Sequence, residues 1–280
     1  MSVEIPPERI EALRSLIYRT AWLIDTGQPH SKEAALCKLF GSEVASRCLN
    51  RTVEICGGFR DGDILVLAET AVATSEGNVV RLADIVPSAH ARRLAEQYQL
   101  DPATAEVVLR ESDSIVGGIP GFLLCMKGGT LLPNAGVDAS NAPPGCVTPL
   151  PADPDASART IRQAVEQATG ARIGVIIADS RTHAMRLGCS GVAIGWAGIP
   201  SVIDDRGRSD LFGRKLEVTK RAVADNIASA AELVMGEADE CTPAAVIRGI
   251  GLPISDDIIG VESIAADECL FMGIFAKSQK

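Results

Sequence analysis

The chain has 280 residues, of which 46% are hydrophobic and 4% aromatic, and it carries a net charge of −9 at pH 7. This length suffices for one large domain or two smaller ones around a mainly aliphatic core. The negative charge argues against a surface that binds nucleic acid or an anionic membrane, because phosphate groups attract basic patches.

The cysteines and the N-terminus indicate a cytoplasmic protein. Eight cysteines form no CxxC pair and most lie in apolar stretches, so we expect reduced thiols rather than disulfides or a zinc site. The first ten residues, MSVEIPPERI, do not resemble a signal peptide. The longest nearly apolar run, residues 191–203, is too short to cross a bilayer.

Residues 7–56 are expected to form two helices. Apolar residues recur with helical spacing in the first: Ile10, Leu13, Ile17, Ala21 and Ile24. Gly27 is a suitable stop for that helix, and Ser31 can cap the next. The second helix carries an apolar residue at every fourth position: Leu36, Phe40, Val44 and Cys48.

The pattern changes at Asp61, where strands begin to alternate with helices. Strands are expected at 63–68, 122–126, 130–135, 173–178, 192–195 and 244–248. Helices are expected at 87–98, 101–110, 157–169 and 219–235, the last with the clearest apolar face. This mixed order favours an α+β fold over a doubly wound parallel sheet.

Three acidic residues stand where a metal ion is expected. Asp138 follows a strand in GVDASN, Asp179 ends the apolar run IGVIIA beside Ser180, and Glu237 follows the long helix. A charge at the end of a buried strand is costly unless it is paired or bound to a cation. Oxygen ligands of this kind suit Mg²⁺ or Mn²⁺, although each aspartate can instead cap a turn or helix.

The N-terminal segment resembles part of a known helical domain. Residues 6–60, through the runs KLFGSEVA and VEICGG, are similar to a piece of the C-terminal domain of acyl-CoA dehydrogenases. In that family this helix pair packs in a bundle, near the flavin of a neighbouring subunit. The resemblance covers about a fifth of the chain, so it implies a helical hairpin over residues 1–60 used for packing or dimerisation. A flavin-dependent redox role is the weaker alternative.

The rest of the chain resembles the coenzyme F420-0:γ-glutamyl ligases. The motifs occur in that family's order and spacing: GVDASN, GVAIGWAG, RGRSDLFGRKLEVT, AVADNIASAAELVMGE and AAVIRGIG. The similarity covers residues 61–255, with a weaker tail to 275. It implies an α+β domain over residues 61–280 in two parts, preceded by the hairpin, and an intertwined homodimer. It also implies GTP-dependent amide formation between a precursor carboxylate and L-glutamate.

The resemblance also assigns site residues. Its metal ligands, for Mg²⁺ or Mn²⁺, correspond to Asp138, Asp179, Ser180 and Glu237. Its guanine-nucleotide contacts correspond to Asn141 and to the segment Met235–Thr242, which begins with Met235, Gly236, Glu237 and Ala238. Arg186, Arg208 and Arg214 are candidates to hold phosphate or carboxylate groups, Arg186 and Arg214 as catalytic residues, although each arginine can equally form a surface salt bridge.

The chain departs from the family on its nucleotide side. The family pattern SKxxSKxEGR reads ETAVATSEGNV here, so Thr70 and Thr74 replace two lysines and Glu69 replaces a serine. His183 stands where an arginine is expected, and the hairpin replaces a nucleotide-contacting loop. Two hypotheses remain open. One is a ligase that adds glutamate to the F420-0 precursor or a similar carboxylate through an acyl phosphate. The other is a degenerate, non-catalytic fusion that keeps the fold as a binding or scaffold module.

Overall fold

The computed structural model describes residues 7–29, 31–33, 36, 58–256, 263–265 and 267–272. The chain divides into two compact units, Met1–Arg60 and Asp61–Lys280. Within the described residues, no helix combines the length and the apolar character that crossing a membrane requires.

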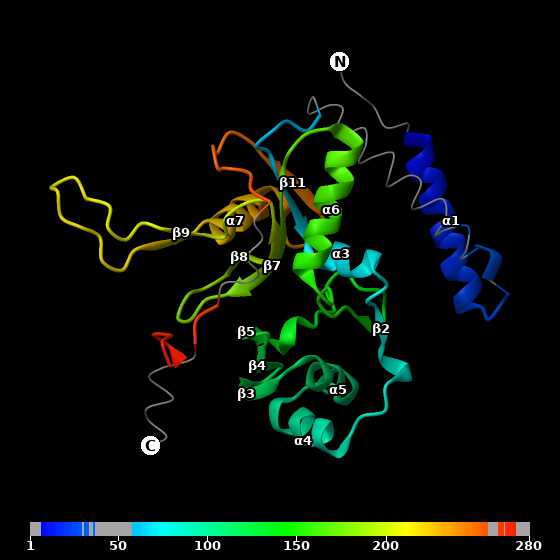
Figure 1. The fold of residues 1–280 in the computed structure, drawn as a ribbon. Coiled ribbons are helices and arrows are strands. Elements are labelled where there is room, and N and C mark those ends of the chain that lie inside the picture. Colours follow the sequence, from blue (N-terminus) through cyan, green and yellow to red (C-terminus); the bar gives the residue numbers. More distant parts are fainter. Residues whose placement is uncertain are drawn as a thin grey trace. The chain divides into compact units, whose positions relative to one another are not determined.

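The first unit contains helix α1, Pro7–Asp25 (Figure 1). The helix ends as its sequence predicts, because Gly27 takes a positive φ of 67° and its N–H bonds to the carbonyl of Ile24 at 3.0 Å. Leu23 is buried, whereas Trp22 is exposed. The second predicted helix is represented only by its start at residues 31–33 and by Leu36, and its remaining apolar positions, Phe40, Val44 and Cys48, lie outside the described residues.

A mixed four-stranded sheet forms the centre of the second unit. Its strands, in spatial order, are β11 (Ala244–Ile247), β1 (Ile64–Ala68), β7 (Gly174–Thr182) and β8 (Cys189–Ala197). Strands β1 and β7 run parallel, and the two outer strands run antiparallel to their neighbours. This mixture of orientations confirms the α+β expectation. The sequence predicted all four strands, but β7 and β8 are longer than expected.

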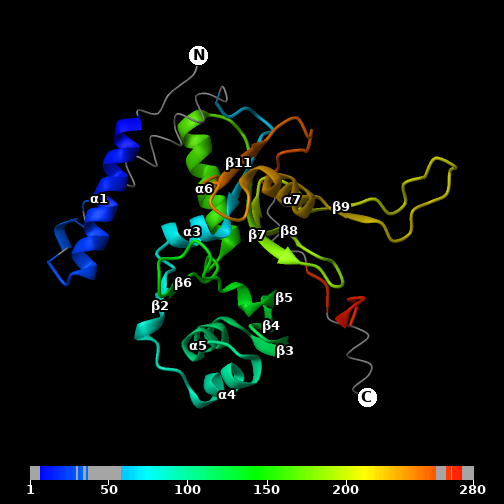
Figure 2. The ribbon, with the colours of Figure 1, turned by 180° about the vertical axis from the view of Figure 1, so that it is seen from behind.

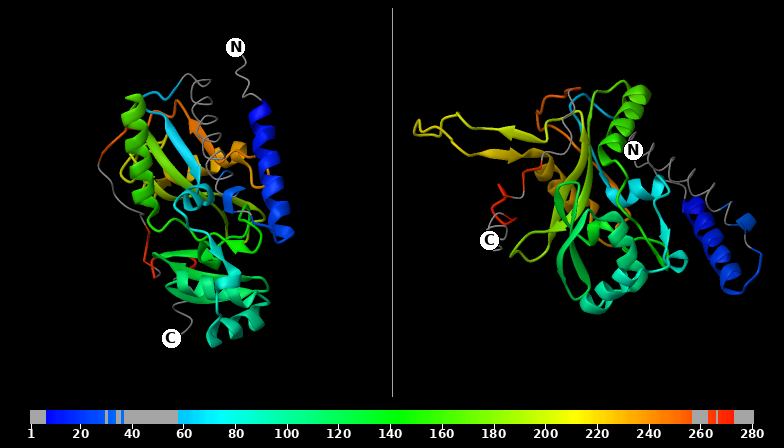
Figure 3. Two further views of the ribbon diagram at one scale, coloured as in Figure 1. Left: turned by 90° about the vertical axis from the view of Figure 1, so that its right-hand side faces the viewer. Right: turned by 60° about the horizontal axis from the view of Figure 1, so that its bottom comes forward.

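Helices α6 (Pro154–Thr169) and α7 (Val223–Met235) cover opposite faces of this sheet (Figure 3). The predicted start of α6 at residue 157 is wrong, because the Asp153 side chain accepts the Ala156 N–H at 2.8 Å and caps the helix three residues earlier. The predicted start of α7 at residue 219 is also wrong. Strand β10 (Lys220–Ala222) pairs with β9 (Val202–Asp204) there, so the helix begins at Val223.

The other part of this unit is a three-stranded antiparallel sheet with two helices beside it (Figure 2). Its strands are β3 (Ser114–Ile119), β4 (Phe122–Lys127) and β5 (Thr130–Pro133). Its helices are α4 (Ala89–Tyr98) and α5 (Pro102–Glu111), which pack on Leu123 and Cys125. The sequence predicted these helices and the β4–β5 hairpin but missed β3.

Short elements connect the two parts. These are α3 (Glu69–Ser75), η1 (Leu82–Asp84), η2 (Asn134–Gly136) and the paired strands β2 (Val80–Arg81) and β6 (Cys146–Val147). Helix α3 was not predicted from the sequence. It follows β1 without a connecting loop, so it places its first residue, Glu69, at the end of the central sheet.

Helix α7 approaches β8 closely at Gly191. A β-carbon on Gly191 would lie 2.6 Å from the backbone carbonyl carbon and oxygen of Ala228. The Ser229 hydroxyl donates to the Gly191 carbonyl at 2.7 Å, and Asp225 accepts the Ala193 N–H at 3.0 Å. The helix is therefore held against the strand at a distance that only glycine allows.

Gly191→Ala should destabilise the protein by about 1–3 kcal/mol, because the added methyl group must push α7 away from the sheet. Urea unfolding measures the change. Gly117→Ala in β3 is the matched control, since a β-carbon there meets no atom within 4 Å. Equal stabilities for the two variants would contradict the close packing.

Candidate functional site

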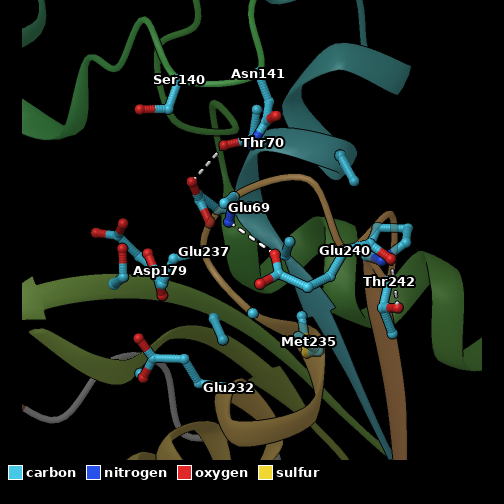
Figure 4. Close-up of a pocket in the computed structure, with 18 of the residues that line it drawn as sticks. Glu69, Thr70, Ser140, Asn141, Asp179, Glu232, Met235, Glu237, Glu240 and Thr242 are labelled. Atoms are coloured by element: carbon cyan, nitrogen blue, oxygen red, sulfur yellow. Dashed lines mark hydrogen bonds between the residues drawn. The ribbon is translucent and has the colours of Figure 1, made fainter.

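A cavity of about 670 Å³ opens where the parallel strands β1 and β7 end (Figure 4). Five segments contribute to it: the end of β1 with the start of α3, the loop at 138–141, the end of β7, Gly191 of β8, and the end of α7 with the residues that follow it. Seven carboxylates are among the residues that line it: Glu69, Asp138, Asp179, Glu232, Glu237, Asp239 and Glu240. The described lining contains no lysine, arginine or histidine.

Most of the site residues expected from the sequence line this one cavity. They are Thr70, Thr74, Asp138, Asn141, Asp179, Ser180, Met235, Gly236, Glu237 and Ala238. Arg186 and Arg214 are not in its lining. Arg186 lies in the turn between β7 and β8, and Arg214 lies in the exposed loop between β9 and β10. Arg208 forms an ion pair with Asp205, as the salt-bridge alternative anticipates.

Asp179 is a largely buried carboxylate with one nearby cation. Arg181, two residues further along β7, donates from Nε to Asp179 Oδ2 at 3.2 Å. Burial raises the pKa of Asp179 and the charge of Asp138 adds to that effect, while Arg181 opposes both. Asp138 Oδ1 accepts the N–H and the hydroxyl of Ser140 at 2.9 and 3.1 Å, so this aspartate does cap a turn.

Glu232 is an acidic residue of the cavity that the sequence analysis missed. It stands on α7 one turn before Glu237, and burial followed by the hydrogen bond and charge of Glu237 raises its pKa to about 7. The ligand atoms of Cys189, Glu232 and Glu237 all lie within 4.8 Å of one another. The sequence feature that could have identified Glu232 is that it is the single acid in the mostly apolar run IASAAELVM.

Glu69 is the second missed acid. In the sequence Glu69 is notable only as the replacement of a serine, yet it projects into the cavity from the first position of α3 (Figure 4). Burial and then the negative charge of Asp179 raise its pKa to about 7, although the Thr70 hydroxyl donates to it at 2.5 Å. Its position directly after a buried strand was the signal that could have identified it.

The donor set fits a hard divalent cation. Seven carboxylates and no lysine, arginine or histidine are found among the described residues that line the cavity, and burial, followed by the charge of neighbouring acids, raises the pKa values of Glu69 and Glu232. Carboxylate oxygens from several segments, close enough to repel one another, are the ligands that Mg²⁺ and Mn²⁺ prefer. Bound cations of this kind would lower those pKa values again.

Glu69→Gln should change how stability depends on pH. The pKa of Glu69 is raised from 4.5 to about 7, so between these values the folded state binds more protons than the unfolded state. The free energy of unfolding therefore falls as pH rises through this window. Glutamine cannot ionise, so the free energy of unfolding of the variant should fall less than that of wild type as pH rises through this window. Above pH 7 the variant should therefore have a higher melting temperature than wild type.

Thermal unfolding in chelator between pH 4.5 and 8.5 checks this expectation. Glu96→Gln, at an exposed position of α4, is the matched control and should keep the wild-type slope. If the melting temperatures of wild type and Glu69→Gln depend on pH in the same way, the pKa of Glu69 is not raised by folding.

Comparison with known proteins identifies two regions. Residues 40–249 match the family profile described as F420-0:Gamma-glutamyl ligase, and residues 8–59 match that of the acyl-CoA dehydrogenase C-terminal domain. The first match starts before residue 61, so it overlaps the second.

Three curated relatives bear the name coenzyme F420:L-glutamate ligase. The protein of Methanopyrus kandleri is 49% identical over 191 residues, which cover 68% of this chain and 76% of the relative. That of Methanothermobacter thermautotrophicus is 43% identical, covering 75% and 83%. That of Methanocaldococcus jannaschii is 44% identical, covering 70% and 79%. The chain therefore belongs to the F420-0:gamma-glutamyl ligase family, an enzyme family of the ligase class.

Proposed function

We propose that this chain is a GTP- and divalent-metal-dependent ligase. It joins L-glutamate through an amide bond to the F420-0 precursor, or to a similar carboxylate, by way of an acyl phosphate. The observation that carries the proposal is the convergence of Asp138, Asp179, Glu232 and Glu237, from three segments of the chain, on one cavity. The names of the relatives, coenzyme F420:L-glutamate ligase, supply the reaction.

The acids of the cavity are assigned to the metal. Asp138, Asp179, Ser180 and Glu237 would hold Mg²⁺ or Mn²⁺, which screens the phosphate charge from an approaching carboxylate. Asn141 and the segment 235–242 would contact the nucleotide. Part of that segment is already ordered by the chain itself, because the Ala238 N–H donates to Glu240 Oε2 at 2.8 Å.

Glu69 is placed to accept a proton. Amide formation releases a proton from the glutamate amine, and a carboxylate that lines the cavity outside the proposed metal ligands can take it up. The Thr70 hydroxyl, which donates to Glu69 at 2.5 Å, would hold the carboxylate in place. We assign Glu69 this role because it lies outside the four proposed metal ligands.

The proposal is tested by mass spectrometry of the product. Wild-type protein incubated with Mn²⁺, GTP, L-glutamate and F420-0 should add glutamate, and Asp179→Asn should lower the rate by at least about 100-fold. Isothermal titration should show that the same variant loses Mn²⁺ binding. Asp84→Asn, at an exposed position of η1, is the control. An unchanged Mn²⁺ affinity in Asp179→Asn would refute the metal assignment.

A degenerate, non-catalytic fusion is the second candidate. The observation that favours it is the lack of any lysine, arginine or histidine among the described residues that line the cavity. Thr70 and Thr74 both line it, and each offers a hydroxyl group where the family has a cation. A nucleotide would then rely on the metal ion for its neutralisation.

Thr70→Lys combined with Thr74→Lys should tighten GTP binding by about 5- to 150-fold, or about 1–3 kcal/mol, because the new ammonium groups face the phosphates. Affinity is measured in saturating Mn²⁺. Gln163→Lys with Gln167→Lys, both at exposed positions of α6, adds the same charge elsewhere. Equal tightening in both double variants would show a general charge effect, and no tightening in either would favour the degenerate fusion.

We further propose a homodimer. The two-stranded segment β9–β10 projects from the central sheet and carries Leu211 and Phe212 at its tip, 98% and 94% exposed (Figure 1). Apolar side chains exposed to this extent are typical of a surface that a partner covers. Light scattering at micromolar concentration should give twice the chain mass of 29.4 kDa. Leu211→Asp with Phe212→Asp should give the single-chain mass, and a wild-type particle of that mass would refute the dimer.

A further inference from the structure

A thiol lies beside two carboxylates of the acidic cavity. The sulfur of Cys189 and one carboxylate oxygen each from Glu232 and Glu237 all lie within 4.8 Å of one another. Both glutamates line the cavity (Figure 4). Cys189 is the first residue of β8, two positions before Gly191, which also lines the cavity. The three side chains therefore form one cluster, which opens into the acidic cavity.

The packing of α7 on β8 explains why Glu232 reaches Cys189. Cys189 and Gly191 project from one face of the strand, because side chains alternate along it. On that face Gly191 lies against Ala228, and an earlier turn of α7 accepts a hydrogen bond from a later residue of β8, so helix and strand run antiparallel. Two residues of strand advance about 6.6 Å and four residues of helix about 6.0 Å. The next pair in this register is thus Cys189 with Glu232.

Sulfur and oxygen together make a donor set that differs from the acids alone. A thiolate is a soft ligand that favours Zn²⁺, whereas carboxylates favour Mg²⁺ and Mn²⁺. Three protein ligands and one water molecule complete an open zinc site. Bond lengths of about 2.3 Å to sulfur and about 2.0–2.2 Å to oxygen place the ligand atoms of tetrahedral zinc roughly 3.5 Å apart, so the side chains here must close by about 1 Å. Cys189 and Glu237 are exposed, which leaves them room to do so and gives the ion a path from solvent.

A cation is expected beside this cluster for a reason that does not depend on Cys189. Glu237 is one of the four residues assigned above to Mg²⁺ or Mn²⁺, through the family to which the chain belongs. Cys189 and Glu232 are not members of that set, so they are available to a second kind of ion. Spacing along the chain does not indicate such a site, because only the packing of α7 on β8 brings the thiol and the two acids together.

We propose that Cys189, Glu232 and Glu237 form a binding site for a thiophilic divalent cation, with Zn²⁺ as the ion that fits best. Zn²⁺ in this site would take Glu237 away from the Mg²⁺ or Mn²⁺ of the ligase reaction, so zinc inhibits the enzyme by competition. The binding site follows from the geometry of the three side chains, whereas the inhibition rests on the proposed function.

Co²⁺ is a probe that reports on the thiolate directly. A cobalt–thiolate bond absorbs in the near ultraviolet and cobalt held by carboxylates alone does not, so Co²⁺ should produce this band saturably in wild type and Zn²⁺ should abolish it. Cys189→Ser should lose the band and bind Zn²⁺ at least about 10-fold more weakly in isothermal titration. Cys241→Ser removes another exposed thiol from the same cavity and is the matched control, which should keep both properties. Glu232→Gln should weaken Zn²⁺ binding by about 10-fold but keep the band at saturating Co²⁺.

Competition between ions tests whether Glu237 is shared. Zn²⁺ should lower the apparent Mn²⁺ affinity of wild type, and it should inhibit glutamate addition by wild type at concentrations at least about 10-fold lower than those that inhibit Cys189→Ser. Zn²⁺ and Mn²⁺ that bind together without competition would overturn the sharing of Glu237.

The absorption band separates this site from the proposed reaction. If wild type lacks the band, or if Cys189→Ser retains it, the thiophilic site is wrong and the ligase proposal stands. If the band depends on Cys189 but no glutamate is added under any metal condition, the site is correct and the ligase proposal fails.

Discussion

The packing of α7 against β8 at Gly191 determines the geometry of the acidic cavity. Strand β8 is hydrogen-bonded to β7, which carries Asp179, and α7 carries Glu232 and ends just before Glu237. The bonds from Ser229 to Gly191 and from Ala193 to Asp225 fix both the distance and the register between helix and strand. A larger residue at Gly191 would separate the acids of α7 from that of β7, since Ala228 leaves no space for it. The donor set therefore depends on one glycine that belongs to none of the acidic segments.

This packing brings together charges that destabilise the folded chain. Burial and mutual repulsion raise the pKa values of Glu69, Asp179 and Glu232, so the folded state holds protons that the unfolded state releases. Arg181 compensates only Asp179, from the neighbouring position on the same strand face. A protein that needed only stability would have apolar side chains here, because unpaired buried charge is costly. The cavity thus retains acids that lower the stability of the folded chain, and the proposed metal site would account for them.

The limits of sequence-based prediction follow from which contacts are local. The apolar runs of β1 and β7 and the periodicity of α7 are sufficient to predict these elements. Ten residues that the motifs single out in separate segments line one cavity. The start of α7 was wrong because residues 220–222 pair with β9, a contact that helical spacing does not reveal. Glu232 lies in a mainly apolar helix, and Glu69 lies where β1 passes directly into α3 without a loop, so neither position indicates a site in the sequence. Arg186 and Arg214 are candidates by their charge, and position along the chain does not indicate that they fall outside the lining of the cavity.

The acids of the cavity set a requirement for the proposed reaction. A carboxylate must attack a phosphate, and two anions repel each other, so a lining with seven acids and no cation among the described residues could not collect both reactants by itself. In the proposed function, a bound Mg²⁺ or Mn²⁺ would supply the missing positive charge. Asp179, one of its proposed ligands, pairs with Arg181 on the same face of β7. Because a single β-strand spaces these two side chains rigidly, the position of this ligand is set by the sheet rather than by a loop.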